Sequence, residues 1–137
     1  MEFRVFVNET KGTVAVKAVD PMQELYEEFA NFYRKYNVMM DFNVFNNFSK
    51  LYRQQIMKMA GIATCNFSEG DVFDREYGES LAKERYLKNF ESYRILMYDF
   101  MADKLTEMAN AASKRLGICV SRRIDRDETI FGMMNLV

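Results

Sequence analysis

The residues that could carry acid–base or metal chemistry gather in one short stretch. It holds five carboxylates: Glu69, Asp71, Asp74, Glu76 and Glu79. Mg²⁺ and Ca²⁺ prefer carboxylate oxygens as ligands, but the spacing fits no EF-hand loop. Acidic residues are also favoured at the start of a helix by its dipole. We therefore expect this stretch to begin a helix, with Asp74 as its N-cap, and we expect no metal site and no cofactor.

The chain contains no histidine and only two cysteines, Cys65 and Cys119. Without histidine, the usual general base and the usual Cys/His zinc sites are absent. A nucleophilic Cys65 would need a lysine, an arginine or a helix N-terminus to activate it, whereas a buried structural thiol needs nothing further. The sequence leaves a disulfide between the two cysteines open. It shows no signal peptide and no apolar run that could span a membrane, so we expect a cytoplasmic, non-enzymatic protein with both thiols free.

The densest basic stretch lies near the C-terminus. It consists of Lys114, Arg115, Arg122, Arg123 and Arg126. These residues could contact phosphates while tyrosines stack on bases. Alternatively, they cap a helix and pair with the acidic residues at positions 125 to 128. The formal net charge is −1, so no global basic field supports nucleic-acid binding.

Large apolar side chains are abundant, with 12 Phe, 8 Tyr and 11 Met. Aromatic side chains bury a large area, and methionine adapts to irregular surfaces. Such a composition serves a rich core, an adhesive interface, or both.

The N-terminal residues predict a β-hairpin. Phe3 to Val7 and Thr13 to Val19 alternate apolar and polar residues around a turn that contains Gly12. A hairpin is marginal alone, so it must pack on a helix or gain a third strand. The alternating segment Ile118 to Ile124 is one candidate for that strand. Ile62 to Phe67 could be another short strand or an extended link.

Two medium helices follow the hairpin. Asp20 and Pro21 mark the start of the first helix, and Asn37 is a plausible terminator. Asp41 could cap the second helix, and Gly61 would end it.

The longest element is predicted between two glycines. No glycine or proline occurs between Gly78 and Gly117, and Glu79 to Leu116 has helical periodicity. Such a helix would be about 55 Å long, longer than a small domain is wide. It must therefore bend, break near Glu91 and Ser92, or extend into a partner. Its apolar stripe could wrap the chain's own core, pair with a second copy or present a groove-binding surface, and we favour a homodimer. Its C-terminus is expected at Gly117. The stripe comprises Tyr86, Phe90, Tyr93, Met97, Phe100, Met101, Leu105, Met108, Ala112 and Leu116.

One segment resembles a pattern in small uncharacterised proteins of phages and mobile elements in low-GC Gram-positive bacteria. The residues that carry the resemblance are Gly61-Ile62-Ala63-Thr64-Cys65, Asp71-Val72-Phe73-Asp74, Gly78, Leu81 and Ala82. The resemblance spans Gly61 to Arg85 and implies a protein that acts inside a bacterium. Small proteins of that kind often inhibit host machinery, including CRISPR effectors. In physical terms, Gly61 would let the chain turn, and Gly78 would let another backbone approach the first helical turn.

Together these features predict a single helix-dominated α+β domain, residues 1–137, with an N-terminal hairpin, two medium helices and one long helix, and with a C-terminal segment that could add a strand. We expect a phage-type protein that docks on a bacterial host protein and inhibits it sterically, with a host-defence inhibitor such as an anti-CRISPR as the favoured example. The alternative is a nucleic-acid-binding accessory protein that uses residues 115 to 126. The residues expected to bind a partner are Tyr86, Tyr93, Met97, Phe100, Met101, Arg122, Arg123 and Arg126.

Overall fold

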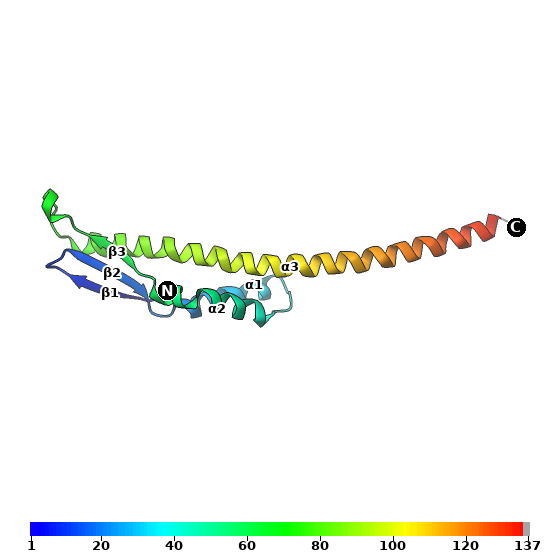
Figure 1. The fold of residues 1–137 in the computed structure, drawn as a ribbon, viewed down its shortest axis with the longest axis horizontal. Helices are drawn as coiled ribbons and strands as arrows, with labels where there is room; N and C mark the ends of the chain where they lie inside the picture. The colour runs from blue at the N-terminus through cyan, green and yellow to red at the C-terminus, as the bar shows by residue number, and fades with distance from the viewer. Residues whose placement is uncertain (136–137) are drawn as a thin grey trace. The chain divides into compact units, whose positions relative to one another are not determined.

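The computed structural model describes the backbone from Met1 to Asn135 and the side chains from Met1 to Gly117. Along the chain the elements are β1 (Phe3–Asn8), β2 (Thr13–Ala18), α1 (Pro21–Lys35), α2 (Phe42–Lys58), β3 (Gly61–Thr64), the short 3₁₀ helix η1 (Phe67–Glu69) and α3 (Arg75–Asn135) (Figure 1). The fold is therefore α+β and helix-dominated, as predicted. Contacts divide the chain into two units, Met1–Phe100 and Met101–Val137. The expectation of a single domain stays a prediction.

The three strands form one antiparallel sheet in the order β1-β2-β3. The hairpin of β1 and β2 is confirmed, with Val5 opposite Val16. The third strand is β3, in which Ala63 lies opposite Val14. The prediction of a strand at Ile118 to Ile124 is wrong, because this segment belongs to α3. The residues preceding the acidic stretch supply the strand instead.

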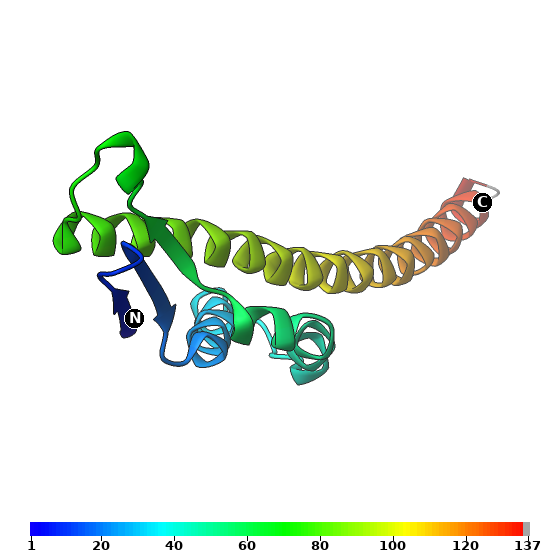
Figure 2. The same cartoon turned by 60° about the vertical axis from the view of Figure 1, so that its left-hand side comes forward.

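The inner face of the sheet packs on the first turns of α3 (Figure 2). Val14, Val16 and Ala63 are buried there together with Ala82 of α3. Phe3, Val5 and Val7 of β1 also pack against this cluster but remain only partly buried. The core of this part of the molecule is thus centred on β2 and β3, and β1 is less well covered.

Glycine allows β3 to approach α3 closely. A Cβ atom on Gly61 would overlap the carbonyl oxygen of Ala82 and lie 2.6 Å from the amide nitrogen of Tyr86. At Gly78 the nearest atom to such a Cβ would be a side-chain atom, Cγ2 of Val14, at 2.9 Å. The close backbone approach expected at Gly78 therefore occurs at Gly61. Gly61 does not act as a turn; it begins a strand that only glycine can place so near a helix.

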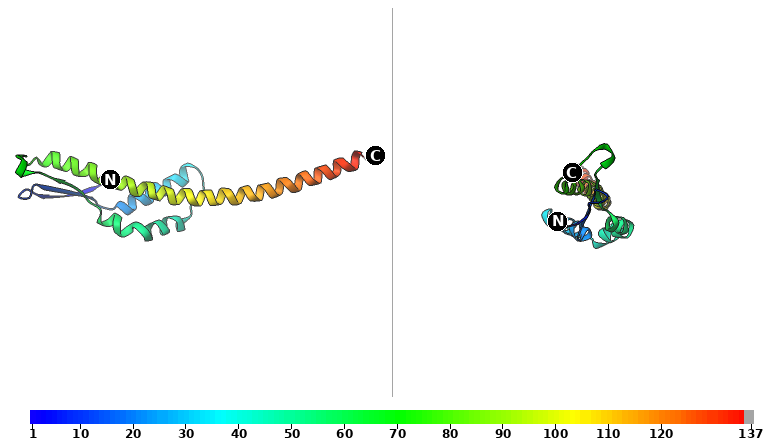
Figure 3. Two further views of the ribbon diagram at one scale, coloured as in Figure 1. Left: turned by 45° about the horizontal axis from the view of Figure 1, so that its top comes forward. Right: turned by 90° about the vertical axis from the view of Figure 1, so that its left-hand side faces the viewer.

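Side-chain caps define the two medium helices. Asp20 Oδ1 accepts a hydrogen bond from the amide of Gln23 at 3.1 Å, and Asp41 Oδ1 accepts one from the amide of Asn43 at 3.0 Å. Both caps were predicted. Asn37 has a φ of 52° just after α1 ends, as a helix terminator requires. In two views α1 and α2 lie beside α3 (Figures 1 and 3), and aromatic contacts join them, such as Phe48 with Phe100 at 5.8 Å.

The third helix is longer than predicted. Its start is as expected, because Asp74 Oδ1 accepts a hydrogen bond from the amide of Tyr77 at 3.2 Å. It contains neither a break at Glu91 and Ser92 nor an end at Gly117, so both of those predictions are wrong. A single glycine costs a helix only about 1 kcal/mol, and no proline follows to stop it. The basic residues before Gly117 are thus interior to α3.

Because Gly61 lies against the backbone of α3, one added methyl group at this position should strongly destabilise the fold. Gly61→Ala should lower the free energy of unfolding by about 3 kcal/mol, because β3 must move off the helix or the helix must deform. Urea denaturation followed by circular dichroism measures this change. Gly117→Ala is the matched control, since no atom of the described side chains lies within 4 Å of a Cβ at that helical position. It should be neutral or slightly stabilising. An unchanged midpoint for Gly61→Ala would contradict the described packing.

Candidate functional site

Three of the residues predicted to bind a partner are buried within the chain. Tyr86, Met97 and Met101 each expose only 1% of their surface. Tyr86 contacts the ring of Phe3 edge-on at 5.6 Å and stacks on Phe90. A partner would not reach these side chains without a rearrangement, so the structure places them in the core rather than on a binding surface.

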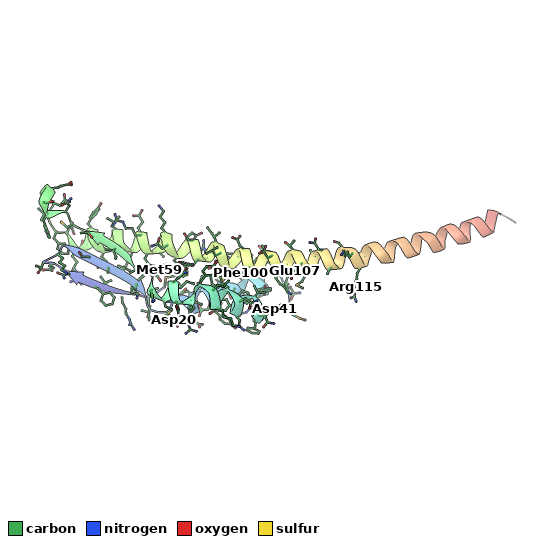
Figure 4. All side chains as sticks on the ribbon, viewed as in Figure 1. Asp20, Asp41, Met59, Phe100, Glu107 and Arg115 are labelled. Atoms are coloured by element: carbon green, nitrogen blue, oxygen red, sulfur yellow. The ribbon has the colours of Figure 1, made fainter. Side chains whose placement is uncertain are left out.

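Tyr93 and Phe100 are partly buried on the side of α3 that faces α2. Both rings contact Tyr52, and the Tyr93 hydroxyl donates a hydrogen bond to Oε1 of Gln55 at 3.2 Å. Phe100 lies on α3 beside α2 (Figure 4). These contacts are structural, although Tyr93 also lines an open groove with Met59 and Leu96.

The remaining predicted residues are arginines of α3. Arg122, Arg123 and Arg126 belong to the helix, not to the expected strand, and their side chains lie outside the described residues. Their proposed contact with phosphates stays a prediction.

Tyr86 carries a buried polar group that is poorly satisfied. Its hydroxyl oxygen is inaccessible and has no hydrogen-bond partner among the described residues. Burial raises the pKa of Tyr86, and a weak interaction with the backbone of Ala18, which does not reach the geometry of a hydrogen bond, lowers this pKa by less. The group is therefore neutral at ordinary pH, and its desolvation costs stability.

A polar contact joins α1 to α3. Tyr98 donates a hydrogen bond to Oε1 of Glu28 at 2.9 Å, and Nε of Arg94 lies 3.7 Å from the same oxygen. Burial, together with Glu28, raises the pKa of Tyr98 to about 12. Tyr98 therefore remains a donor at neutral pH, so this arrangement ties two helices together and supplies no catalytic base.

A cavity of about 320 Å³ opens beside Cys65. Val14, Leu81 and Phe73 line it, together with Asp71. Burial and the charge of Asp71 raise the pKa of the Cys65 thiol, which opposes nucleophilic activation. Among residues 1 to 117, no group of three Cys, Asp or Glu side chains could hold a metal ion. Within the acidic stretch, Asp71 Oδ2 accepts a hydrogen bond from the amide of Asn66 at 3.3 Å, and Asp74 caps α3.

The outer face of the sheet, which is turned away from α3, exposes an apolar row. The row consists of Phe6, Ala15 and Ile62, which are aligned across β1, β2 and β3. Phe6 is 54% and Ile62 49% exposed. We call Phe6, Ala15 and Ile62 the outer row.

Two basic residues lie next to the outer row. Arg4 and Lys17 are directly opposed in the register of β1 and β2. Neither forms an ion pair with any described residue. Like charges opposite one another destabilise a sheet, so this pair is not explained by folding.

The described side chains of the second unit are also largely exposed. Met108 and Leu116 expose 48% and 65% of their surface. With Leu105 and Ala112 they follow helical spacing and form one apolar stripe. We call Leu105, Met108, Ala112 and Leu116 the distal stripe.

Comparisons with known proteins found no matching family model, no similar curated protein and no similar solved structure. In the described part of the chain, no helix has both the length and the apolar character needed to cross a membrane.

The outer row was missed in the sequence, although a signal was present. Because Phe6 is two residues after Arg4, both lie on the same face of β1, and Phe6 is an apolar residue on the face that the sequence marks as polar. Ile62 could not be assigned to a face before the short strand β3 was known.

Because the buried hydroxyl of Tyr86 is unsatisfied, its removal should stabilise the chain rather than destabilise it. Tyr86→Phe should raise the free energy of unfolding by about 1 kcal/mol, because it removes a buried polar group but retains the ring. Urea denaturation at neutral pH measures this change. Tyr98→Phe is the matched control, and it should be destabilising because its hydroxyl is hydrogen-bonded to Glu28. Loss of stability in Tyr86→Phe would show that the hydroxyl has a partner.

Proposed function

We propose that the chain is a non-enzymatic, phage-type binding protein that docks on a bacterial host protein in the cytoplasm and inhibits it sterically. A host-defence inhibitor, such as an anti-CRISPR, is the example that we favour. The observation that carries this proposal is the outer row, an apolar strip on the open face of the sheet beside two basic residues that form no ion pair with any described side chain.

Several features support binding rather than catalysis. The chain lacks histidine, and the Cys65 thiol has a raised pKa. In the cavity beside Cys65, the charge of Asp71 disfavours the thiolate that nucleophilic chemistry would need. By contrast, the outer row presents an aromatic side chain on β1 and an aliphatic side chain on β3, one on each side of Ala15. Buried apolar anchors, aromatic ones above all, form the core of many protein interfaces, and charged residues lie at the rim.

The docking surface can be tested by substitution at its centre. The tagged chain is used to capture proteins from a lysate of a low-GC Gram-positive bacterium, with Phe6→Asp as the test variant. One specific host protein should be captured by the wild-type chain and reduced at least tenfold with Phe6→Asp, because a charge is placed in the apolar contact.

Leu51→Asp is the matched control, because Leu51 is an exposed apolar residue of α2. It should leave capture unchanged, and circular dichroism should show that both variants are folded. A host protein lost with Leu51→Asp but retained with Phe6→Asp would contradict the proposed surface. Failure of the wild-type chain to capture a specific protein would count against the function itself.

We also propose that two copies of the chain associate through the distal stripe. Nothing in the described residues covers Met108 or Leu116, and an apolar helical stripe gains free energy when a second helix buries it.

Light scattering measures this association directly. The wild-type chain should have twice the mass of a monomer, and Leu116→Glu should shift it to the monomer. Asn110→Glu, an exposed residue on the opposite face of α3, should leave the dimer intact. A wild-type monomer at the highest concentration tested would contradict the homodimer.

A further inference from the structure

The sheet has two edges, and they differ. In β3, the carbonyl oxygen of Ile62 accepts a hydrogen bond from Nη1 of Arg85 at 2.6 Å. Because Arg85 lies on α3, a side chain of the helix occupies part of this edge. No such side chain reaches the outer edge of β1 among the described residues.

The backbone groups at the β1 edge can be assigned from the register. The amide of Val19 donates to the carbonyl of Glu2 at 2.9 Å, and Arg4, Phe6 and Asn8 follow at alternate positions opposite β2. Antiparallel pairs alternate in this way, so the N–H and C=O groups of Phe3, Val5 and Val7 point away from β2. Among the described residues, these groups have no hydrogen-bond partner outside the sheet. They present an open template for a further strand.

Side-chain burial shows that the sheet is incomplete at this edge. On the inner face, Val14 and Val16 of β2 expose at most 1% of their surface because strands flank them on both sides. The equivalent residues of β1, Phe3, Val5 and Val7, pack on the same cluster but stay partly exposed. A strand added beside β1 would cover them as β1 covers β2.

The charges at this edge favour an incoming strand with acidic side chains. Arg4 is on the outer face of β1, and Lys17 lies opposite it, so two cations are adjacent without an acid in contact. Glu2 is the nearest acid in sequence, and it precedes the strand. An incoming acidic side chain next to Arg4 would relieve the repulsion between Arg4 and Lys17. Next to Phe6, an apolar side chain would extend the outer row.

We infer that β1 is the docking edge for an extended segment of a partner protein, which adds as a fourth strand and carries acidic residues on its outer side. This inference rests on the proposed function, because it names how the partner is held. Backbone hydrogen bonds to Phe3, Val5 and Val7 supply affinity, and Arg4 with Lys17 supplies the preference for acids. A nucleic acid is disfavoured, since the chain has a net charge of −1 and the outer row offers one aromatic ring for stacking.

The experiment uses the full chain and two fluorescein-labelled peptides of identical length. One alternates valine with glutamate and the other alternates valine with lysine, and binding is followed by fluorescence anisotropy at low salt. The acidic peptide should bind about tenfold more tightly than the basic one. Arg4→Glu should reverse this preference, whereas Lys50→Glu, an exposed residue of α2, should leave it unchanged.

A second variant tests the backbone part of the inference. Val5→Pro removes an N–H that points away from β2, so the hairpin hydrogen bonds are retained while the docking edge is interrupted. It should weaken both peptides at least tenfold with an unchanged circular dichroism spectrum. If this variant is unfolded, Arg4→Glu still decides the question, since an exposed charge reversal leaves the fold intact.

Equal binding of the two peptides, or binding of neither, would overturn the inference. So would a wild-type dimer that Val5→Pro abolishes, because a second copy would then occupy β1. An oligonucleotide could also bind these cations. If a single-stranded oligonucleotide binds more tightly than the acidic peptide and this binding is lost in Arg4→Glu, then Arg4 and Lys17 bind phosphate and the inference is wrong. Capture of a host protein through Phe6, together with equal peptide binding, would retain the proposed function and reject the docking edge alone.

Discussion

The close approach of β3 to α3 at Gly61 is the constraint on which the rest of this structure depends. A Cβ at this position would collide with the backbone of the helix at Ala82. Because the strand can lie so close, Ala63 and the neighbouring valines of β2 reach the helix and become buried. A hairpin that would be marginal by itself is thereby held on a helix through its third strand.

This arrangement leaves an asymmetric sheet. The β3 edge is near the helix, where Arg85 bonds to the carbonyl of Ile62. β1 is the strand farthest from that contact. Its inward-facing residues, Phe3, Val5 and Val7, are less buried than the inward-facing residues of β2. The same geometry turns Phe6 and Ile62 to the open face. The surfaces that we assign to binding are therefore consequences of how the sheet is anchored, and they require no conformational change to be presented.

Local sequence signals predicted the parts of the fold that local chemistry determines. The hairpin was evident from alternation, and Asp20, Asp41 and Asp74 act as the expected caps. The third strand was not decided, because the four residues of β3 carry no stronger pattern than the alternation at Ile118 to Ile124. The end of α3 was wrong because a glycine within a helix costs little when no proline follows. Tertiary packing, which the sequence does not display, decided the third strand, whereas the continuation of α3 past Gly117 is a local effect.

The site was less predictable than the fold for a related reason. Helical spacing identified Tyr86 and Met97 as members of an apolar stripe, but spacing does not distinguish a core from an interface, and both are buried by the chain itself. The outer row depends on the register between strands that are far apart in the sequence, with Phe6 and Ile62 on opposite sides of Ala15. Such a surface becomes visible only when the sheet is assembled.

Amide hydrogen exchange of the isolated chain, resolved by residue with NMR, tests this account most directly. An anchored sheet with an open β1 edge predicts that the amides of Arg4, Phe6 and Asn8 are protected, while those of Phe3, Val5 and Val7 exchange rapidly. The amide of Ala63, next to the contact at Gly61, should be among the slowest in the chain. Uniform protection along β1 would show that the edge is already paired, and rapid exchange at Ala63 would show that β3 is not held on α3.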